Sequence, residues 1–183
     1  IKGIILDNHK KIFCNSLVIT TGTFLGGKIF VGDTTFKAGR IGDKSSSKLS
    51  KTIRNLGLPV GRLKTGTPPR IYAQSINYDV LEPQISENNG IFLSYFTKQN
   101  TNKKINCFIT KTNNKTHKII RDNLDKSAMY SGIIKSQGVR YCPSIEDKIT
   151  KFGDRNGHNI FLEPEGLNSD LVSPNGISNS LDK

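Results

Sequence analysis

The thiol of Cys142 has the most reactive chemical surroundings in this sequence. Arg140 lies two residues before it, and Pro143 and Ser144 follow at a position typical of a helix start. A nearby cation and a helix N-terminus both stabilise a thiolate, which is the reactive form of cysteine. Cys142 is therefore a candidate nucleophile. The alternative is a buried and inert cysteine, which is the more common fate of a free thiol.

Two acidic residues, Glu146 and Asp147, fall in the first turn of the helix expected after Cys142. They are candidate acid/base groups, although adjacent acids at this position usually stabilise the helix dipole instead. The other cysteines, Cys14 and Cys107, alternate with apolar neighbours and fit the buried, inert alternative better.

Residues 61–70 form a second candidate site, which combines cations with threonines and glycines. Gly66 would let the backbone approach a ligand, and the cations suit phosphate groups. The residue order is not that of a P-loop, and a rigid turn braced by prolines is the alternative. The three cations are Arg62, Lys64 and Arg70.

Short apolar runs separated by glycine-rich and asparagine-rich turns predict a mixed α/β chain. The run 17–21 is dense enough for a strand that is buried on both faces and ends at Gly22. The other expected elements are a β-hairpin (2–14), a loop-rich stretch (22–43), a helix capped by serines 45–47 and carrying Leu49, Ile53 and Leu56, a strand-rich insertion (71–114), a helix with Ile119, Ile120 and Leu124 on one side, a connector (127–140), a helix from Ser144, a strand (158–162) and a loop-rich tail.

Composition limits the classes of function. The 183 residues include 27 Lys and Arg against 15 Asp and Glu, a net charge of +12. This charge predicts an anionic partner such as nucleic acid, or else reflects a compositionally biased, lysine-rich surface. No apolar run reaches the roughly 20 residues of a membrane span, and the first residues do not read as a signal peptide. The three cysteines and three separated histidines predict reduced thiols, a cytosol-like compartment and no metal site.

Several segments resemble the GidA/MnmG family in order and approximate spacing. The resemblance covers essentially the whole chain, and the longer motifs make it specific. The segments are 21–25, 61–70, 140–148 and 160–167, with shorter agreement at 116–125 and 174–178.

The resemblance implies an α/β fold, namely part of a glutathione-reductase-like FAD/NAD(P)-binding domain with an inserted small α+β domain. Residues 1–70 would belong to the FAD-binding domain, residues 71–137 to the insertion, and residues 138–183 to the return of the FAD-binding domain. The turn at Gly22 would then pass close beneath the cofactor.

The resemblance also implies a function. Members of this family add a carboxymethylaminomethyl group to carbon 5 of the wobble uridine of certain tRNAs. They use FAD, NADH and methylenetetrahydrofolate, and they are cytoplasmic homodimers that work with a GTPase partner, MnmE. The positive charge of the chain would then serve tRNA binding, and no membrane association is expected.

Residue by residue, the resemblance makes Cys142 one of the family's important cysteines, a nucleophile or acid/base thiol in uridine C5 chemistry. Arg62, Lys64 and Arg70 would contact phosphates of the cofactor or the tRNA, and no metal ligand is implied. The implied cofactor-binding residues are Thr21, Gly22, Thr23, Gly138, Val139, Arg140, Tyr141, Cys142, Pro143, Ser144, Ile145, Glu146, Asp147 and Lys148.

The sequence departs from the family at Val139, where proline is frequent, and at Ser173, where tyrosine is frequent. It lacks the GxGxxG fingerprint, a second key cysteine and the C-terminal helical domain, so we expect an internal fragment that is inactive by itself. Two alternatives are a non-catalytic basic RNA-binding fragment and a related folate- and FAD-dependent tRNA uridine methyltransferase.

Overall fold

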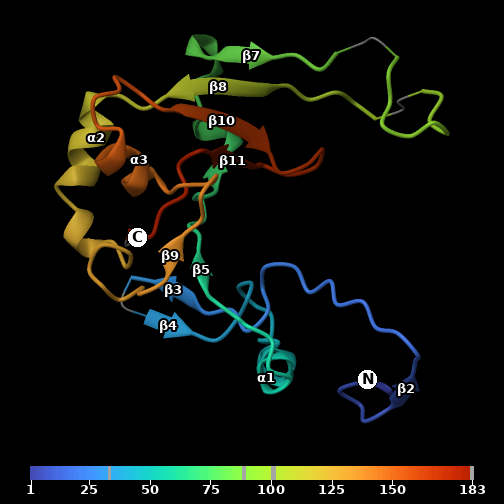
Figure 1. Ribbon diagram of the computed structural model, residues 1–183. Helices are drawn as coiled ribbons and strands as arrows, with labels where there is room; N and C mark the ends of the chain where they lie inside the picture. Colours follow the sequence, from blue (N-terminus) through green and yellow to red (C-terminus); the bar gives the residue numbers. More distant parts are fainter. Residues whose placement is uncertain (33, 88–89, 100–101, 182–183) are drawn as a thin grey trace. The chain divides into compact units, whose positions relative to one another are not determined.

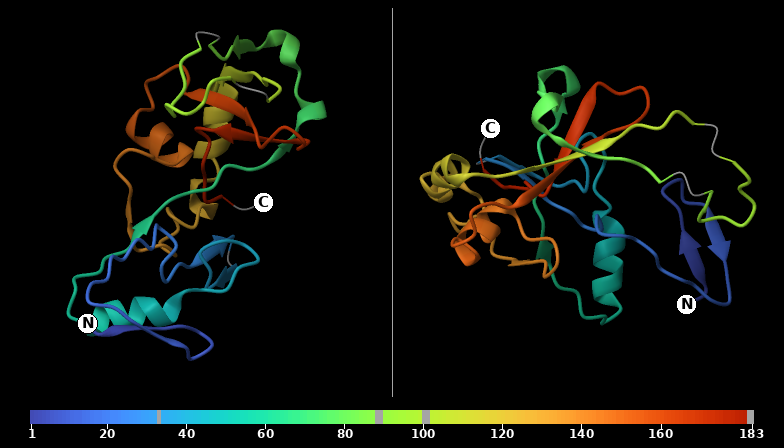
Figure 2. Two further views of the ribbon diagram at one scale, coloured as in Figure 1. Left: turned by 90° about the vertical axis from the view of Figure 1, so that its right-hand side faces the viewer. Right: turned by 90° about the horizontal axis from the view of Figure 1, so that it is seen from above.

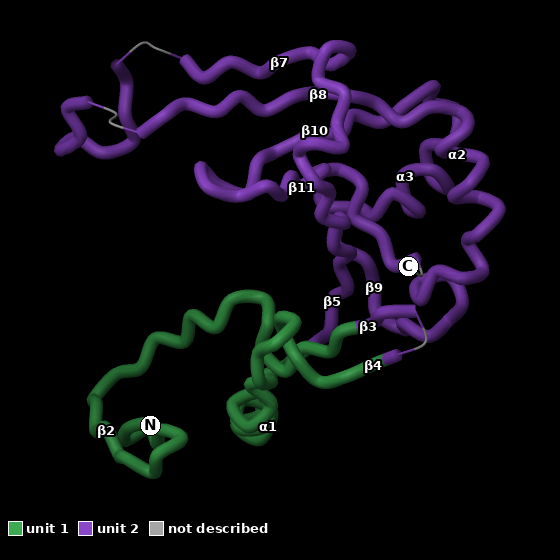
Figure 3. Tube along the Cα trace, turned by 180° about the vertical axis from the view of Figure 1, so that it is seen from behind, with its two compact units in different colours: residues 1–29, 35–60 green, residues 30–34, 61–183 purple. Residues whose placement is uncertain are grey.

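The computed structural model describes residues 1–32, 34–87, 90–99 and 102–181, and the chain divides into two compact units (Figure 3). The first unit comprises residues 1–29 and 35–60, and the second comprises residues 30–34 and 61–183. Within the described ranges, no helix has the length and apolar character that a membrane crossing requires.

The expected hairpin and helix of the first unit are confirmed, but the expected serine cap of the helix does not form. β1 (Gly3–Ile5) pairs antiparallel with β2 (Lys11–Phe13). α1 (Ser47–Asn55) follows Ser46, whose side chain makes no capping hydrogen bond. The helix ends before Gly57, which has a φ of +77° and so accepts the left-handed conformation of a helix end.

The prediction of a strand at residues 17–21 is wrong. The structure has no strand there, and the side chain of Val18 is 82% exposed. A strand buried on both faces needs a hydrogen-bonded neighbour and cover on each side. In the described part of the chain no strand pairs with this run, so its apolar composition alone does not make it a strand.

The expected loop-rich stretch also contains two short strands. β3 (Ile29–Val31) and β4 (Thr34–Phe36) form a two-stranded sheet. All of β4 is exposed, so it lacks the buried apolar alternation by which a strand is recognised in a sequence.

A five-stranded antiparallel sheet is the centre of the second unit (Figure 1). Ile160, Leu162 and Val172 are its buried apolar residues, and Phe108 packs against them. In spatial order the strands are β6 (Ile71–Tyr72), β11 (Leu171–Asn175), β10 (Asn159–Pro164), β8 (Cys107–Lys111) and β7 (Glu82–Gln84).

This sheet joins strands from both sides of the expected boundary at residue 137. β6, β7 and β8 come from the expected insertion, whereas β10 and β11 come from the expected return segment. The strands expected within 107–109 and 158–162 are confirmed. The tail, expected to be loop-rich, instead contributes β11, because the alternate residues Val172 and Pro174 are buried beside β10.

Two helices pack against each other in the second unit (Figure 2). α2 (Asn114–Arg121) begins after Asn113, whose side chain accepts the Thr116 N–H at 3.0 Å. α3 (Ile145–Lys151) begins after Ser144, whose hydroxyl accepts the Asp147 N–H at 3.4 Å. The start of α3 confirms the helix predicted from Ser144, and α2 confirms the helix predicted around Ile119 and Ile120.

The core between these helices consists of Ile120, Ile145 and Ile149, with Leu124 and Leu181 packed around it. Ile119, expected on the same face as Ile120, is exposed, because consecutive residues of a helix point in different directions. The remaining short elements of this unit are the 3-10 turns η1 (Ala73–Ser75), η2 (Tyr78–Val80) and η3 (Leu124–Lys126) and the strands β5 (Leu63–Lys64) and β9 (Gln137–Gly138).

Candidate functional site

The two segments that carry the most chemistry lie side by side in the second unit. β5, from the segment 61–70, pairs in parallel with β9, so that Lys64 lies opposite Gly138 at the start of the Cys142 segment. The same segment also contacts the end of the chain, where the Asn179 N–H donates to the Thr67 carbonyl at 3.5 Å.

The expectation that Gly66 lets the backbone approach a ligand needs correction. A Cβ on Gly66 would lie 2.8 Å from the Asn179 nitrogen and 2.9 Å from its carbonyl oxygen. The close approach that requires glycine here is therefore to the chain's own backbone.

Lys64 is held by an internal ion pair. Its Nζ lies 3.7 Å from Asp147 Oδ2, and the two side chains are 7% and 11% exposed. Burial lowers the pKa of Lys64, and the negative charges of Asp147 and Glu146 partly oppose this effect. The ammonium is thus directed at a carboxylate, and the phosphate contact expected of it stays a prediction.

The Asp147 carboxylate contacts three side chains, those of Lys64, Tyr130 and Lys151. Tyr130 donates its hydroxyl to Oδ1 at 3.2 Å, and Lys151 lies 3.0 Å from the same oxygen. Burial by itself would raise the pKa of Asp147, but hydrogen bonding to Lys151, the charges of Lys64 and Lys151, and the Tyr130 hydroxyl outweigh it, so the pKa is lowered. The ionised carboxylate therefore stabilises the folded state.

Replacing Asp147 by asparagine in the intact protein should lower the free energy of unfolding by about 1–3 kcal/mol at pH 7. Because the folded pKa lies below the ordinary value of 3.8, this stabilisation is present above that value and is lost as pH falls through the folded pKa. The measurement is urea unfolding from pH 7 down to about pH 3, over which the difference between variant and wild type should shrink.

Asp122→Asn is the matched control for this prediction. Asp122 also pairs with a lysine of its own helix, Lys118 at 2.6 Å, but both side chains are more than half exposed. Its replacement should change stability little. A loss for Asp147→Asn that is no greater than for Asp122→Asn would contradict the stabilising role.

Glu146, the other candidate acid, is fully buried in a polar network. Its Oε1 accepts hydrogen bonds from the Ser127 hydroxyl at 3.0 Å, the Ser180 N–H at 2.8 Å and the Ser180 hydroxyl at 3.1 Å. Through these bonds α3 is tied both to the connector after α2 and to the last described residues. Glu146 therefore holds these segments together, and its buried carboxylate is not exposed for acid/base chemistry.

Cys142 lies on an exposed turn just before α3. It is a free, exposed thiol, and the adjacent Tyr141 is also exposed, with the Arg140 guanidinium 5.0 Å from its ring centre. Burial lowers the pKa of the nearby Lys148, and the charge of Cys142 opposes this effect. The Lys148 ammonium donates to the Gly176 carbonyl at 2.8 Å.

The expected cofactor-binding segment 138–148 therefore has two parts. Arg140, Tyr141 and Cys142 have exposed side chains, and Gly138, Val139, Pro143 and Lys148 are half-buried. The side chains of the remaining residues are buried against the protein, and cofactor contact by them stays a prediction. These buried residues are Ser144, Ile145, Glu146 and Asp147.

Arg62 and Arg70, the other two cations of the segment 61–70, have exposed side chains. Arg70 Nε lies 2.6 Å from Glu165 Oε1 on the surface. Arg62 is exposed and lines a shallow hollow with Phe30 and residues 133–137. The phosphate contacts expected of these two guanidinium groups also stay predictions.

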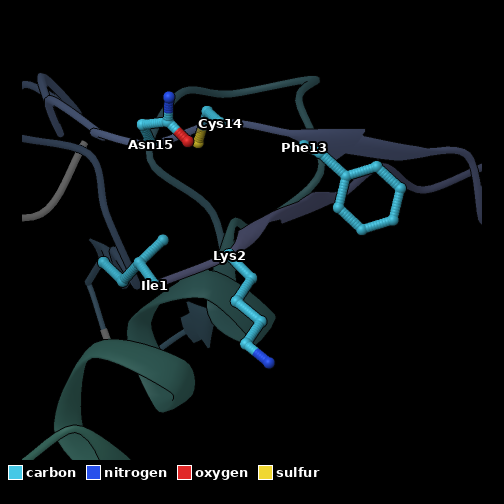
Figure 4. Close-up of a pocket in the computed structure, with 5 residues that line it drawn as sticks. All are labelled: Ile1, Lys2, Phe13, Cys14 and Asn15. Atoms are coloured by element: carbon cyan, nitrogen blue, oxygen red, sulfur yellow. The ribbon is translucent and has the colours of Figure 1, made fainter.

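The turn at Thr21, Gly22 and Thr23 belongs to the first unit and is exposed. Gly22 has a φ of +63°, and a Cβ added to it would meet nothing within 4 Å. The first unit also has a shallow hollow at its hairpin, where Cys14 lies beside Asn15 (Figure 4). Cys14 and Cys107, expected to be buried, are half-buried free thiols.

Two histidines that are far apart in sequence come together in the second unit. The ring centres of His117 and His158 lie 5.4 Å apart. The Thr112 hydroxyl lies between the two residues: it forms a hydrogen bond with His117 Nε2 at 2.7 Å and accepts the backbone N–H of His158 at 2.8 Å. The pKa of His158 is lowered, mainly by burial and further by the charges of His117, Lys148 and Arg155. Sequence spacing gives no sign of this pair, and the described residues contain no larger grouping of His, Cys, Asp or Glu placed to hold a metal ion.

Comparisons with known proteins agree with the resemblance. The family model described as glucose inhibited division protein A matches residues 1–183. The structure of Aquifex aeolicus GidA in the form I crystal matches at a TM-score of 0.83 and 42% identity, over 98% of this chain and 31% of that one. The form II crystal of the same protein matches at a TM-score of 0.82 and 39% identity, over 98% of this chain and 29% of that one.

This chain thus spans about a third of the length of those GidA chains. The likeness in backbone and sequence confirms the expected α/β fold class as that of the FAD-binding part of GidA. With a family model that matches every residue, the chain belongs to the GidA family.

Proposed function

We propose that the protein containing this chain is a flavoprotein that modifies tRNA. In this proposal it adds a carboxymethylaminomethyl group to C5 of the wobble uridine, with FAD, NADH and methylenetetrahydrofolate as cofactors. It would act as a cytoplasmic homodimer together with a GTPase partner of the MnmE type. The observation that supports this best is the match of the GidA family model to all 183 residues, the exposed Cys142 turn included.

Two exposed backbone turns, one in each unit, support the fit of the chain to FAD. Gly22 has open space where a Cβ would stand, which suits close approach of a flat cofactor. The turn 140–142 offers a guanidinium, an aromatic ring and a thiol at the surface. We propose that these turns hold parts of FAD, which when bound would supply electron and hydride transfer.

We further propose that Cys142 acts directly on the uracil ring. Its thiolate would add to C6, forming an S–C6 bond, and the electron pair of the C5–C6 double bond would move to C5 and O4. C5 is then nucleophilic toward the one-carbon unit derived from methylenetetrahydrofolate. After C5 forms its new bond, loss of its proton and expulsion of the thiolate restore the double bond.

The surroundings of Cys142 favour this role. The thiol is exposed, Arg140 is two residues away, and the partly buried Lys148 interacts with its charge. The Lys148 ammonium is itself fixed by the Gly176 carbonyl.

Deleting the gene is the experiment that tests the function. We expect tRNA from such cells to lose the carboxymethylaminomethyl group at the wobble uridine, as measured by mass spectrometry of its nucleosides, and the intact gene to restore it. The purified intact protein should show flavin absorbance. Loss of 5-methyluridine instead would indicate the related methyltransferase. An unchanged tRNA with a colourless, RNA-binding protein would indicate the non-catalytic alternative that the charge of +12 also permits.

A further inference from the structure

The described part of the chain between β7 and β8 extends beyond the ends of the sheet (Figures 1 and 2). Its described residues 91–99, here called the aromatic loop, place large side chains in solvent. Tyr95 and Phe96 are 105% and 94% exposed, and Leu93 is exposed as fully. Three fully exposed apolar side chains within four residues form an apolar patch, and such a patch marks an interaction site.

A tight backbone turn carries both aromatic residues. The Thr97 N–H donates to the Ser94 carbonyl at 3.2 Å, and the Phe96 N–H donates to the Ser94 hydroxyl at 3.2 Å. Tyr95 and Phe96 are the two central residues of this turn, so both side chains lie at its corner. The turn thus displays two neighbouring rings on a short, locally hydrogen-bonded backbone.

The charge around the aromatic loop is of one sign. No Asp or Glu occurs in residues 88–106, which contain the aromatic loop, whereas this stretch includes the cations Lys98, Lys103 and Lys104. The Lys104 ammonium already donates to the Glu87 carbonyl at 3.1 Å. Lys98 lies two residues after Phe96 and is exposed.

We infer that the aromatic loop binds unpaired bases of RNA, with Tyr95 and Phe96 stacking on bases and Lys98 neutralising a phosphate. Exposed rings beside cations are the recurring means of binding single-stranded nucleic acid. The aromatic rings alone would also suit a protein interface, but lysine is depleted there, so Lys98 beside the rings favours nucleic acid. The inference rests on the proposed function in that the RNA would be the tRNA substrate.

The test measures binding of fluorescein-labelled tRNA to the intact protein by fluorescence anisotropy. Replacing Tyr95 and Phe96 together by alanine should raise the Kd by about tenfold or more, since each stacked base contributes about 1–3 kcal/mol. Lys98→Gln should weaken binding and reduce the salt dependence of log Kd by about one unit of slope. Because these side chains are exposed, urea unfolding should be unchanged.

Tyr72→Ala is the matched control, since Tyr72 is an exposed tyrosine on the edge strand β6. It should leave the Kd unchanged. If the double variant also binds tRNA with wild-type Kd, the inference is wrong, and a simultaneous change of oligomeric state by light scattering would assign the loop to a protein interface. If the wild-type protein does not bind tRNA, the proposed function fails together with the inference.

Discussion

Replacing Cys142 by serine in the intact protein is expected to abolish most of the tRNA modification while leaving the flavin absorbance unchanged. Serine has nearly the same size, and the side chain it replaces is exposed on a turn, so the fold and the cofactor site should persist. The hydroxyl is a far weaker nucleophile and acid than the thiol. We expect the rate of modification to fall by about 10²–10⁴-fold, measured by nucleoside mass spectrometry of tRNA incubated with the purified enzyme.

Cys107→Ser is the control for this prediction, because Cys107 is a half-buried free thiol in β8 and away from the Cys142 turn in sequence. It should retain nearly all activity. Two results would count against a chemical role for Cys142: modification at the wild-type rate in Cys142→Ser, or an equal loss in both serine variants. Loss of flavin from Cys142→Ser alone would assign the thiol to cofactor binding instead.

Local signals in the sequence predict those elements whose stabilising contacts are also local. The capping residues Asn113 and Ser144 each bond to a backbone N–H three residues later, so the starts of α2 and α3 can be predicted from short windows. The hairpin β1–β2 closes over a short turn for the same reason. By contrast, the apolar run 17–21 could become a strand only with distant partners, which its own residues do not specify.

The candidate site shows the same division. The exposed turn around Cys142 could be predicted because its residues are consecutive. The ion pair of Lys64 with Asp147, the hydrogen bond of Tyr130 to Asp147 and the His117–His158 pair join residues that are far apart in sequence. A single sequence carries no signal for such pairs. The local sequence around Lys64 therefore predicts a ligand role, whereas the fold pairs its ammonium with the buried Asp147 carboxylate.

Replacing Glu146 by alanine is expected to destabilise the intact protein by about 3 kcal/mol or more. The carboxylate is fully buried and accepts hydrogen bonds from the Ser127 hydroxyl and from both the N–H and the hydroxyl of Ser180. Alanine leaves these donors without this acceptor inside the protein, where each unsatisfied group costs about 1–3 kcal/mol. It also leaves a cavity at the start of α3. Urea unfolding measures the loss.

Glu146→Gln separates the contribution of the hydrogen bonds of Glu146 from that of its negative charge. The amide keeps an acceptor oxygen and nearly the same volume, and its NH2 group would take the place of Oε2, which has no hydrogen-bond partner among the described atoms. The loss should then be well below that of alanine. Glu82→Ala, at an exposed position in β7, should change stability little. If alanine and glutamine cost the same, the charge of Glu146 rather than its hydrogen bonds stabilises α3, and the nearby ammonium of Lys64, whose pKa Glu146 raises, would be its partner.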